Sequence, residues 1–311
     1  DYYRRNNFDL IGVINTQGAG GTIAKYANIA SMKSSGIELT ISSKNMRTKD
    51  FSWNTDFIFS KTKNEITDLK SHANVLSLIS GNGFGREGYP VRGLFSIPFA
   101  GLTEDGLPTF INQDGQKTIS SFNFQEYEKL DFLKYEGPTD PTITGSFGNI
   151  LTYKNLKLNV FVTYSFGNVI RLDPVFSNAY SDLDAMPKEF KNRWMKAGDE
   201  NVTNIPTIVS TRMNQQYAYL NMAYNAYNYS DVRIADGGFI RLKEISLSYD
   251  LPAKVINFFR LNKLQLKLQA TNLCLLYADS KLNGQDPEFF RSGGVSTPVP
   301  KQFTFTVRLG L

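Results

Sequence analysis

Residues 303–311 read Phe-Thr-Phe-Thr-Val-Arg-Leu-Gly-Leu, and the pattern of this stretch decides the fold. A large apolar side chain stands at every second position, with threonine, arginine or glycine in between. Successive side chains of a β-strand point to opposite faces of a sheet, whereas a helix repeats its apolar positions every three to four residues. The stretch therefore predicts a strand with one apolar face and one polar face.

The same two-residue period recurs along the chain. In one strongly apolar run the alternation slips by one residue, at Lys243-Glu244. One extra residue in a strand is typical of a β-bulge, so we predict a bulge at this point. Together with the turn signals between them, the alternating stretches predict about ten strands, at residues 2–14, 36–44, 51–61, 89–100, 107–112, 145–153, 156–166, 238–249, 264–273 and 303–311.

The connections between these strands alternate in length. The short ones are residues 45–50, 101–106 and 154–155, and the long ones are residues 15–35, 62–88, 113–144, 167–237 and 274–302. The connection 250–263 is intermediate in length but still much shorter than its long neighbours. Up-and-down membrane barrels have short periplasmic turns and long loops outside the cell. The sequence therefore predicts an all-β fold, an antiparallel up-and-down transmembrane β-barrel with long extracellular loops. Because long outer loops and short periplasmic turns alternate, strand 303–311, which follows a long loop, would run toward the periplasm and leave the C-terminus there.

The composition fits a β-rich chain. Of the 311 residues, 13% are aromatic, which favours strands and the aromatic belts of membrane barrels. No stretch of sequence approaches the roughly 18 consecutive apolar residues of a membrane helix. The net charge of +5 is scattered, and its tight clusters, Arg4-Arg5 and Arg47-Thr48-Lys49, are short. We therefore predict no nucleic-acid partner, because such a partner calls for a basic stripe or a known motif.

The residues that carry chemistry give little support to an enzyme. The single cysteine, Cys274, excludes an internal disulfide, and it lies far in sequence from the single histidine, His72. Neither a Cys/His metal site nor any cofactor is predicted. Close carboxylate pairs occur at Glu104 and Asp105, Asp182 and Asp184, and Asp286 and Glu288. Their spacing in loops does not specify the facing geometry that a glycosidase needs, so we predict no catalytic residues.

The long connection 167–237 is rich in aromatic residues. Its candidate substrate-contact residues are Trp194, Tyr217, Tyr219, Tyr224, Tyr227 and Tyr229. Aromatic faces stack on sugar rings and on other apolar ligand surfaces, while the tyrosine hydroxyl adds a polar group. The alternative interpretation is that these side chains form a contact surface for a lid, or pack the core of the loop itself.

Several motifs, in chain order, resemble the C-terminal half of the SusC/RagA family of TonB-linked outer-membrane proteins. The most specific is Asp236-Gly237-Gly238-Phe239-Ile240-Arg241-Leu242-Lys243, followed by Ile245-Ser246-Leu247-Ser248-Tyr249 and Leu251-Pro252. The others are residues 28–39, 49–55, 88–91, 101–108 with Asp114-Gly115, 193–199, 204–206, 269–273 and 300–305. The matches span nearly the whole chain, and their succession is more specific than any one of them.

The resemblance implies a place and a task for the chain. Members of the family have a signal, a TonB-contacting segment, a plug and a barrel of about 22 strands. Residues 1–311 would then be the C-terminal part of one such barrel, with the plug and the N-terminal strands outside this chain. Leu311 departs from the pattern here, since such barrels commonly end on phenylalanine or tryptophan.

The implied function is active import of large nutrients, oligosaccharides or peptides, through the outer membrane of a bacterium. Its implied partners are a SusD-like surface lipoprotein as a lid, TonB acting through the N-terminal region, and the surrounding outer-membrane lipid. The alternative hypothesis is a soluble or surface β-rich carbohydrate-binding module. The two hypotheses differ in where the apolar face points: toward lipid in a membrane barrel, and into a core in a soluble module.

Overall fold

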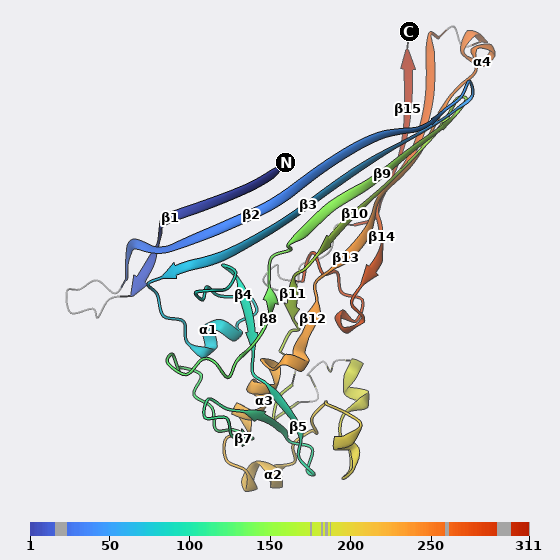
Figure 1. Ribbon diagram of the computed structural model, residues 1–311. Helices are drawn as coiled ribbons and strands as arrows, with labels where there is room; N and C mark the ends of the chain where they lie inside the picture. The colour runs from blue at the N-terminus through green and yellow to red at the C-terminus, as the bar shows by residue number, and fades with distance from the viewer. Residues whose placement is uncertain are drawn as a thin grey trace.

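The computed structural model describes residues 1–15, 24–174, 176–181, 183, 186, 188–258, 261–290 and 300–310, so that Leu311, Asp182 and Asp184 lie outside the described residues. Figure 1 shows two parts, a long twisted sheet and a smaller folded unit at one end of it. We call this unit the loop subdomain; it consists of the described residues of segments 70–142 and 167–238. None of the helices in the described ranges is long and apolar enough to cross a membrane.

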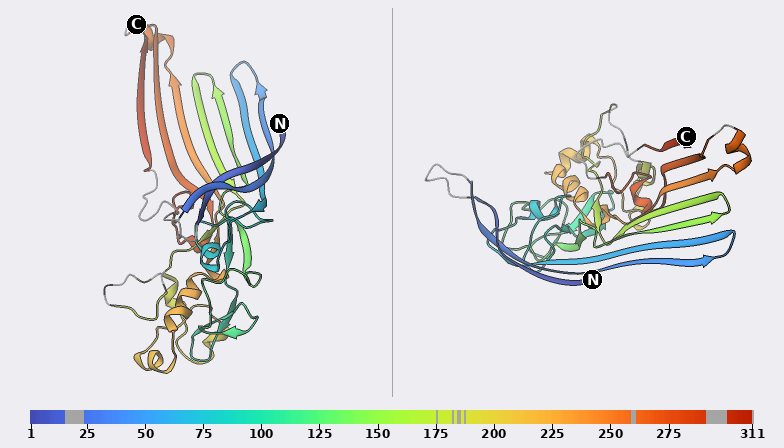
Figure 2. Two further views of the ribbon diagram at one scale, coloured as in Figure 1. Left: turned by 90° about the vertical axis from the view of Figure 1, so that its left-hand side faces the viewer. Right: turned by 90° about the horizontal axis from the view of Figure 1, so that it is seen from above.

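The main sheet is antiparallel, and its strands follow one another in chain order. Its eight strands are arranged β1-β2-β3-β9-β10-β13-β14-β15, with β1 and β15 at the two edges. Figure 2 shows that the sheet is open and curved. The strands are β1 (Tyr2–Asn15), β2 (Ala24–Arg47), β3 (Phe51–Leu69), β9 (Ile143–Tyr153), β10 (Leu156–Phe166), β13 (Phe239–Asp250), β14 (Lys263–Ala278) and β15 (Gln302–Gly310). The predicted all-β, up-and-down order is confirmed.

The predicted number of sheet strands was wrong. Predicted strands 89–100 and 107–112 do not join the main sheet; they contain β4 (Gly93–Ser96), the start of β5 (Phe99–Leu102) and β6 (Pro108–Ile111) of the loop subdomain. All four residues of β4 are buried. A short strand buried on both faces has the same local composition as a barrel strand, because both are rich in apolar residues. Because two consecutive predicted strands are absent from the main sheet, the remaining strands keep the directions predicted for them.

The short connections lie at one end of the sheet and the long ones at the other (Figure 1). Residues 48–50 and 154–155 are tight turns, and the connection 251–262 contains helix α4 (Ala253–Phe258). The predicted long loop 15–35 was too long, since β2 begins at Ala24 and runs for 24 residues, against 11 in β9. Strands β1, β2 and β3 therefore extend well past the others on the side of the long loops.

The predicted bulge at Lys243-Glu244 is confirmed. Leu242 and Glu244 pair with the adjacent residues Val162 and Phe161 of β10, so Lys243 is the extra residue in β13. The pairing of β13 with β14 also shifts between Leu242 and Glu244, where the extra residue lies in β14. Large apolar residues of β13 face outward on either side of the bulge, so the apolar face is preserved.

One face of the main sheet is apolar across six adjacent strands. Residues directly opposite one another in an antiparallel sheet share a face. Register pairing places a single row across the sheet: Trp53, Leu151, Leu158, Leu247, Leu268 and Phe305. The adjacent row on the other face is largely polar: Asn54, Ile150, Asn159, Ser246, Gln269 and Thr304. The alternation read from the sequence is therefore one continuous surface in three dimensions.

The apolar face points away from the loop subdomain. On the opposite face Arg241 is buried against Asp286, which belongs to the loop that follows β14. Large apolar side chains of the first face are open instead, with 58% of Leu268 and 62% of Phe305 exposed. We call the apolar side the outer face and the other side the inner face.

Two rows of aromatic residues border the outer apolar band. Near the short turns, register pairing aligns Phe51 with Tyr153, and the same row reaches Tyr249. Nearer the long loops, a second row contains Phe59, Tyr164 and Tyr277. The rows are eight residues apart along β3, about 26 Å at the usual rise per residue. For strands tilted as in transmembrane barrels this is about 20 Å in height, close to their apolar band of about 25 Å.

The outer band contains one polar cluster, on β2, β3 and β9. The amide oxygen of Asn149 accepts hydrogen bonds from the indole nitrogen of Trp53 and the hydroxyl of Thr55, both at 2.8 Å. The side chain of Asn45 donates to the hydroxyl of Thr55 at 2.6 Å and accepts from Ser43 at 2.8 Å. These polar groups satisfy one another, as an apolar environment requires.

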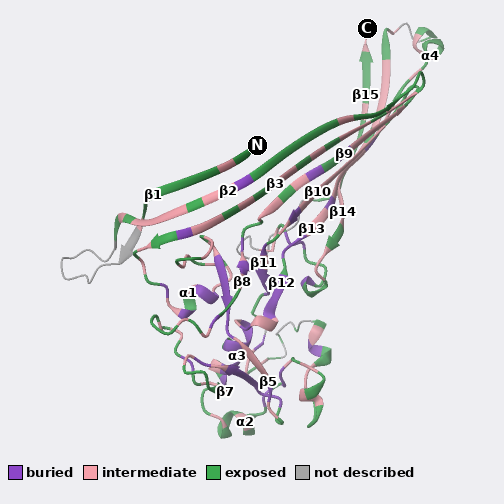
Figure 3. Ribbon diagram, viewed as in Figure 1, coloured by how far each residue is buried: buried purple, intermediate pink, exposed green. Residues whose placement is uncertain are grey.

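The loop subdomain has a hydrophobic core of its own, drawn in purple in Figure 3. Its largest fully buried side chains include Leu78, Phe95 and Phe110 from segment 70–142, and Leu220 and Tyr224 from segment 167–238. The remaining elements are α1 (Val75–Ile79), β7 (Lys117–Thr118), β8 (Lys134–Pro138), β11 (Val169–Arg171), η1 (Lys188–Asn192), η2 (Asp199–Asn201), α2 (Thr211–Gln216), α3 (Leu220–Asn228), η3 (Asp231–Arg233), β12 (Ile234–Asp236) and, after β14, η4 (Ser280–Leu282). Two long connections thus fold together as one unit.

Candidate functional site

The two segments of the loop subdomain are joined at a buried arginine. The guanidinium of Arg171 donates to the carbonyl of Phe95 at 2.7 Å and to the hydroxyl of Ser96 at 2.9 Å, both in segment 70–142. It also donates to the carbonyl of Ser230 at 3.1 Å. Burial lowers the pKa of Arg171 to about 10, which still leaves the side chain charged at neutral pH. The planar fork of arginine can reach several acceptors at once, which a lysine could not.

A half-buried carboxylate, Glu136 of β8, lies near this arginine. Burial raises the pKa of Glu136, although the charges of Lys134 and Arg171 act in the opposite direction. The ring of Tyr229 faces the same guanidinium, with 5.7 Å between its centroid and Cζ of Arg171. Of the candidate contact residues, Tyr229 is therefore placed to pack on a buried cation.

The loop after β14 is attached to the inner wall by a second buried arginine. Arg241 of β13 donates to the carboxylate of Asp286 at 2.6 Å, and Glu288 lies 3.2 Å from the same guanidinium. The charge of Arg241 thus compensates both carboxylates of the pair Asp286 and Glu288. In the pair Glu104 and Asp105, Asp105 accepts a hydrogen bond from Tyr217. Among the residues that the structure describes, no cluster of histidine, cysteine and carboxylates could hold a metal ion.

Two of the candidate contact residues form the core of the loop subdomain. The exposed fractions of Tyr224 and Tyr227 are 1% and 2%. The hydroxyl of Tyr224 donates to the carbonyl of Thr207 at 2.6 Å, and the ring of Tyr227 packs edge-on against Phe176 at 4.8 Å between centroids. Both residues lie on α3 and have raised pKa values, chiefly because of burial. They present no surface to a ligand, as the core-packing alternative held.

Trp194 fixes the turn that contains Gly106. Its indole nitrogen donates to Glu200 at 3.1 Å, and its backbone nitrogen donates to the carbonyl of Ile205 at 3.0 Å. The ring covers Gly106, whose φ is +75°. A Cβ at Gly106 would lie 2.4 Å from the indole, so no other residue fits without a shift. The half-buried Trp194 thus joins segment 167–238 to segment 70–142.

We predict that Gly106→Ala loosens this contact. Both the left-handed backbone and the collision with the indole disfavour a side chain there, at a cost of about 2–4 kcal/mol. The measurement is amide hydrogen exchange at Trp194 and at Thr207, whose backbone nitrogen donates to the carbonyl of Gly106 at 3.0 Å. Gly115→Ala is the matched control, because Gly115 has φ +73° and nothing within 4 Å of its added Cβ. Equal exchange in the two variants would contradict the proposed role of Trp194.

Tyr217 and Tyr219 line an open groove between β7 and the connection from α2 to α3. Figure 1 shows β7 and α2 at the end of the loop subdomain remote from the main sheet. The groove has a volume of about 520 Å³ and is also lined by Lys117, Thr118 and Ser120. Tyr219 is 71% exposed and has a left-handed backbone, φ 63°, at the start of α3. The hydroxyl of Tyr217 donates to Asp105 at 2.8 Å, and this hydrogen bond raises the pKa of Tyr217.

The groove brings together residues that the sequence keeps apart. Lys117 and Thr118 form β7 in segment 70–142, about one hundred positions before Tyr217 and Tyr219 in the numbering. The sequence analysis missed both of them, because a lysine and a threonine in a loop carry no local signal of a site. Their proximity to the tyrosines depends on the shared core of the two segments, which local sequence patterns do not encode.

Comparisons with known proteins agree with the fold and the motifs. No protein-family model matches the chain. A TonB-dependent receptor of Formosa agariphila is 25% identical over 93% of the chain, and the TonB-dependent receptor SusC of Bacteroides thetaiotaomicron is 24% identical over all of it. The chain spans only 28% and 29% of the lengths of these relatives. These matches confirm the resemblance to SusC/RagA-type proteins that the motifs predicted.

The fold is similar to that of a solved transporter. The structure of the RagAB peptide transporter aligns with 99% of this chain at a TM-score of 0.73 and 22% sequence identity. The structure of the RagAB peptide importer in its open-open state aligns with all of the chain at a TM-score of 0.74 and 21% identity. In each case the chain covers 32% of the solved chain. The likeness shows the fold of a barrel segment with its loops.

Proposed function

We propose that this chain, which resembles SusC/RagA-type TonB-dependent receptors, is the C-terminal part of the barrel of an outer-membrane nutrient importer. The observation that carries the proposal is the outer face of the main sheet. Its apolar band is about 26 Å long along the strands between two aromatic rows, or about 20 Å in height for tilted strands, close to the apolar band of transmembrane barrels. The inner face is largely polar, and the loop after β14 is held against it by Arg241 and Asp286, as on the wall of a water-filled lumen.

The exposed apolar face also argues against a soluble carbohydrate-binding module. A soluble module would bury this face in a core, but here 75% of Phe303 and 62% of Leu309 are exposed. A contiguous apolar surface across several strands is a liability in water and a requirement in lipid. By the parity of the connections, the long loops would lie outside the cell and the end of β15 in the periplasm.

The partners and the ligand follow from the same proposal. A SusD-like surface lipoprotein would cover the long loops, and TonB would act through the plug of the whole receptor. The ligand would be an oligosaccharide or a peptide. The groove of Tyr217 and Tyr219 supports such a ligand, because the exposed ring of Tyr219, the half-buried ring of Tyr217 and the neighbouring hydroxyl and ammonium groups suit large polar molecules. Tyr224, Tyr227 and Trp194 would support the groove as part of the core and its adjoining turn.

Uptake by cells tests this proposal. We expect that deleting the gene of the whole receptor abolishes uptake of one of two fluorescent probe sets, neutral oligosaccharides or peptides. The full receptor should restore uptake, and the double variant Tyr217→Ala/Tyr219→Ala should lower it about tenfold at limiting ligand, since an aromatic contact contributes about 0.5–1.5 kcal/mol. Tyr127→Ala is the control, because Tyr127 is exposed elsewhere in segment 70–142.

Each arm of this experiment has its own consequence. Recovery of the receptor in the soluble fraction would exclude the importer and favour the soluble module. If the double tyrosine variant is found in the membrane and shows normal uptake, the importer proposal stands but the groove is not its ligand site. The type of probe that is lost would decide between oligosaccharide and peptide.

A further inference from the structure

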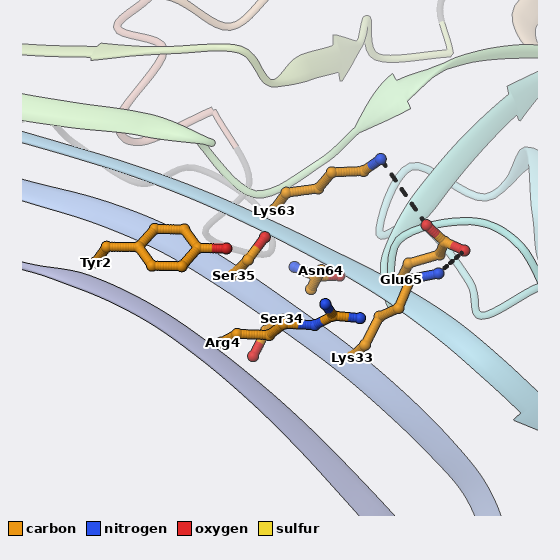
Figure 4. A pocket seen from close by; sticks show the side chains of 8 residues that line it. All are labelled: Tyr2, Arg4, Lys33, Ser34, Ser35, Lys63, Asn64 and Glu65. Atoms are coloured by element: carbon orange, nitrogen blue, oxygen red, sulfur yellow. Dashed lines mark ion pairs between the residues drawn. The ribbon is translucent and has the colours of Figure 1, made fainter.

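A basic cluster lies on the outer face, where β1, β2 and β3 extend past the apolar band. Figure 4 shows its side chains, with Lys33 and Lys63 on either side of Glu65. Register pairing places Arg4 opposite Ser35, Ser35 opposite Lys63, and Lys33 opposite Glu65. Residues opposite one another share a face, and so do residues two positions apart in one strand. Ser35 therefore shares the face of Ile37, which belongs to the outer band. The cluster therefore faces outward, away from the lumen.

The positive charge of the cluster is only partly neutralised. Glu65 lies 2.8 Å from the ammonium of Lys33 and 3.8 Å from that of Lys63. Arg4 has no carboxylate partner among the residues that the structure describes. Three cations thus face one carboxylate around a depression of about 220 Å³. The side chain of Lys63 is 77% exposed, so its ammonium is available to an anion.

The height of the cluster is set by the aromatic row nearer the long loops. Lys63 lies four residues beyond Phe59 of that row, about 13 Å along β3 and about 10 Å in height for a strand tilted as in transmembrane barrels. Aromatic rows mark the boundary of the hydrocarbon, and the headgroup layer lies directly outside it. The cluster would therefore stand at the level of the lipid headgroups, facing the lipid.

We propose that Arg4, Lys33 and Lys63 bind a phosphate group on the headgroup of an outer-leaflet lipid. The proposal rests on the membrane placement given under the proposed function. Arginine guanidinium and lysine ammonium groups attract anionic headgroups at a membrane surface, and arginine can hold two phosphate oxygens at once. The ring of Tyr2, which also lines the depression, adds an amphipathic side chain at the boundary, where tyrosines of membrane proteins gather. One lipid phosphate would complete the charge balance of the cluster.

The experiment uses the whole receptor, purified from outer membranes in mild detergent. Native mass spectrometry counts retained lipopolysaccharide, and titration then compares phosphorylated lipid A with chemically dephosphorylated lipid A. We expect the triple variant Arg4→Gln/Lys33→Gln/Lys63→Gln to bind phosphorylated lipid A at least about tenfold more weakly than the natural protein. Dephosphorylated lipid A should bind both proteins equally.

A matched variant controls for the change in net charge. Arg5→Gln/Lys44→Gln/Lys157→Gln removes three positive charges from inner-face positions of β1, β2 and β10. It should bind phosphorylated lipid A within about twofold of the natural protein. Heat-modifiable migration on gels verifies that both variants fold.

Three results would overturn the inference. One is unchanged lipid A binding by the outer-face variant. Another is displacement of lipid A by inorganic phosphate at equal concentration, which would indicate a site for free phosphate. The third is retained lipid with loss of a co-purified protein, which would indicate an acidic protein partner. In each case the receptor still fractionates with the outer membrane, so the proposed function stands; a soluble receptor would overturn both.

Discussion

Leu268→Arg is expected to destabilise the folded barrel by about 2 kcal/mol, whereas Gln269→Arg, one residue further along β14, is expected to change it little. Leu268 lies on the outer face in the row of Trp53 and Phe305, and Gln269 lies on the inner face. A charge inside the apolar band must leave water or distort the bilayer, while a charge in the lumen stays hydrated. The row of Leu268 is two residues from the nearer aromatic row, so the cost is below that at the midplane.

The measurement is reversible unfolding of the whole receptor in lipid vesicles by denaturant, followed by heat-modifiable migration on gels. The two substitutions lie in the same strand and each adds one positive charge. The difference between their unfolding free energies therefore reports which face of the sheet receives the charge. Equal effects at the two positions would mean that the outer face does not meet lipid. That result would remove the main support for an outer-membrane barrel.

Arg171→Met is expected to loosen the loop subdomain by about 3–5 kcal/mol while leaving the main sheet folded. The substitution removes the donor to Phe95, Ser96 and Ser230 and leaves those buried acceptors without it. An unsatisfied buried acceptor costs about 1–3 kcal/mol, and the nearby half-buried Glu136 loses a compensating charge. Arg171→Lys should recover only part of the loss, because its ammonium cannot span all three acceptors.

Hydrogen exchange of the whole receptor checks this expectation. Amides of β4 and of residues 228–230 should exchange faster by a factor of about 100 or more in Arg171→Met, since 1.4 kcal/mol corresponds to tenfold. Amides of β10 and β13 should be unaffected. Arg212→Met serves as the control, since Arg212 is exposed on α2. Uniform loss of protection in the sheet and the loops would contradict the idea of a separately stabilised subdomain.

The sequence predicted the sheet well because its two faces meet different environments. Alternation at residues 303–310, 156–166 and 264–273 produces one apolar and one polar face, and all three stretches lie in strands of the main sheet. The slip at Lys243-Glu244 was readable for the same reason, since an extra residue would otherwise move every later side chain to the wrong face.

The loop subdomain was not predictable in the same way. Its strand β4 is short and buried on both faces, so residues such as Leu94 and Phe95 gave the signal of a barrel strand. Residue type alone does not separate the candidate tyrosines: Tyr224 and Tyr227 lie on the buried side of α3, whereas Tyr219 precedes the helix as its N-cap. Which side of that helix meets the core depends on segment 70–142, which lies far away in the chain.

The shared core has a consequence for how binding specificity could change between related receptors. Arg171, Trp194 and Tyr217 each link segment 167–238 to segment 70–142, through Phe95, Gly106 and Asp105 respectively. In a chimera that exchanges one segment alone, the new segment would not match the core and the contacts of the segment that is kept. Exchange of both segments together, with the strands between them kept, would transplant the unit intact. New ligand preferences would therefore be inherited by paired exchange of the two segments and not loop by loop.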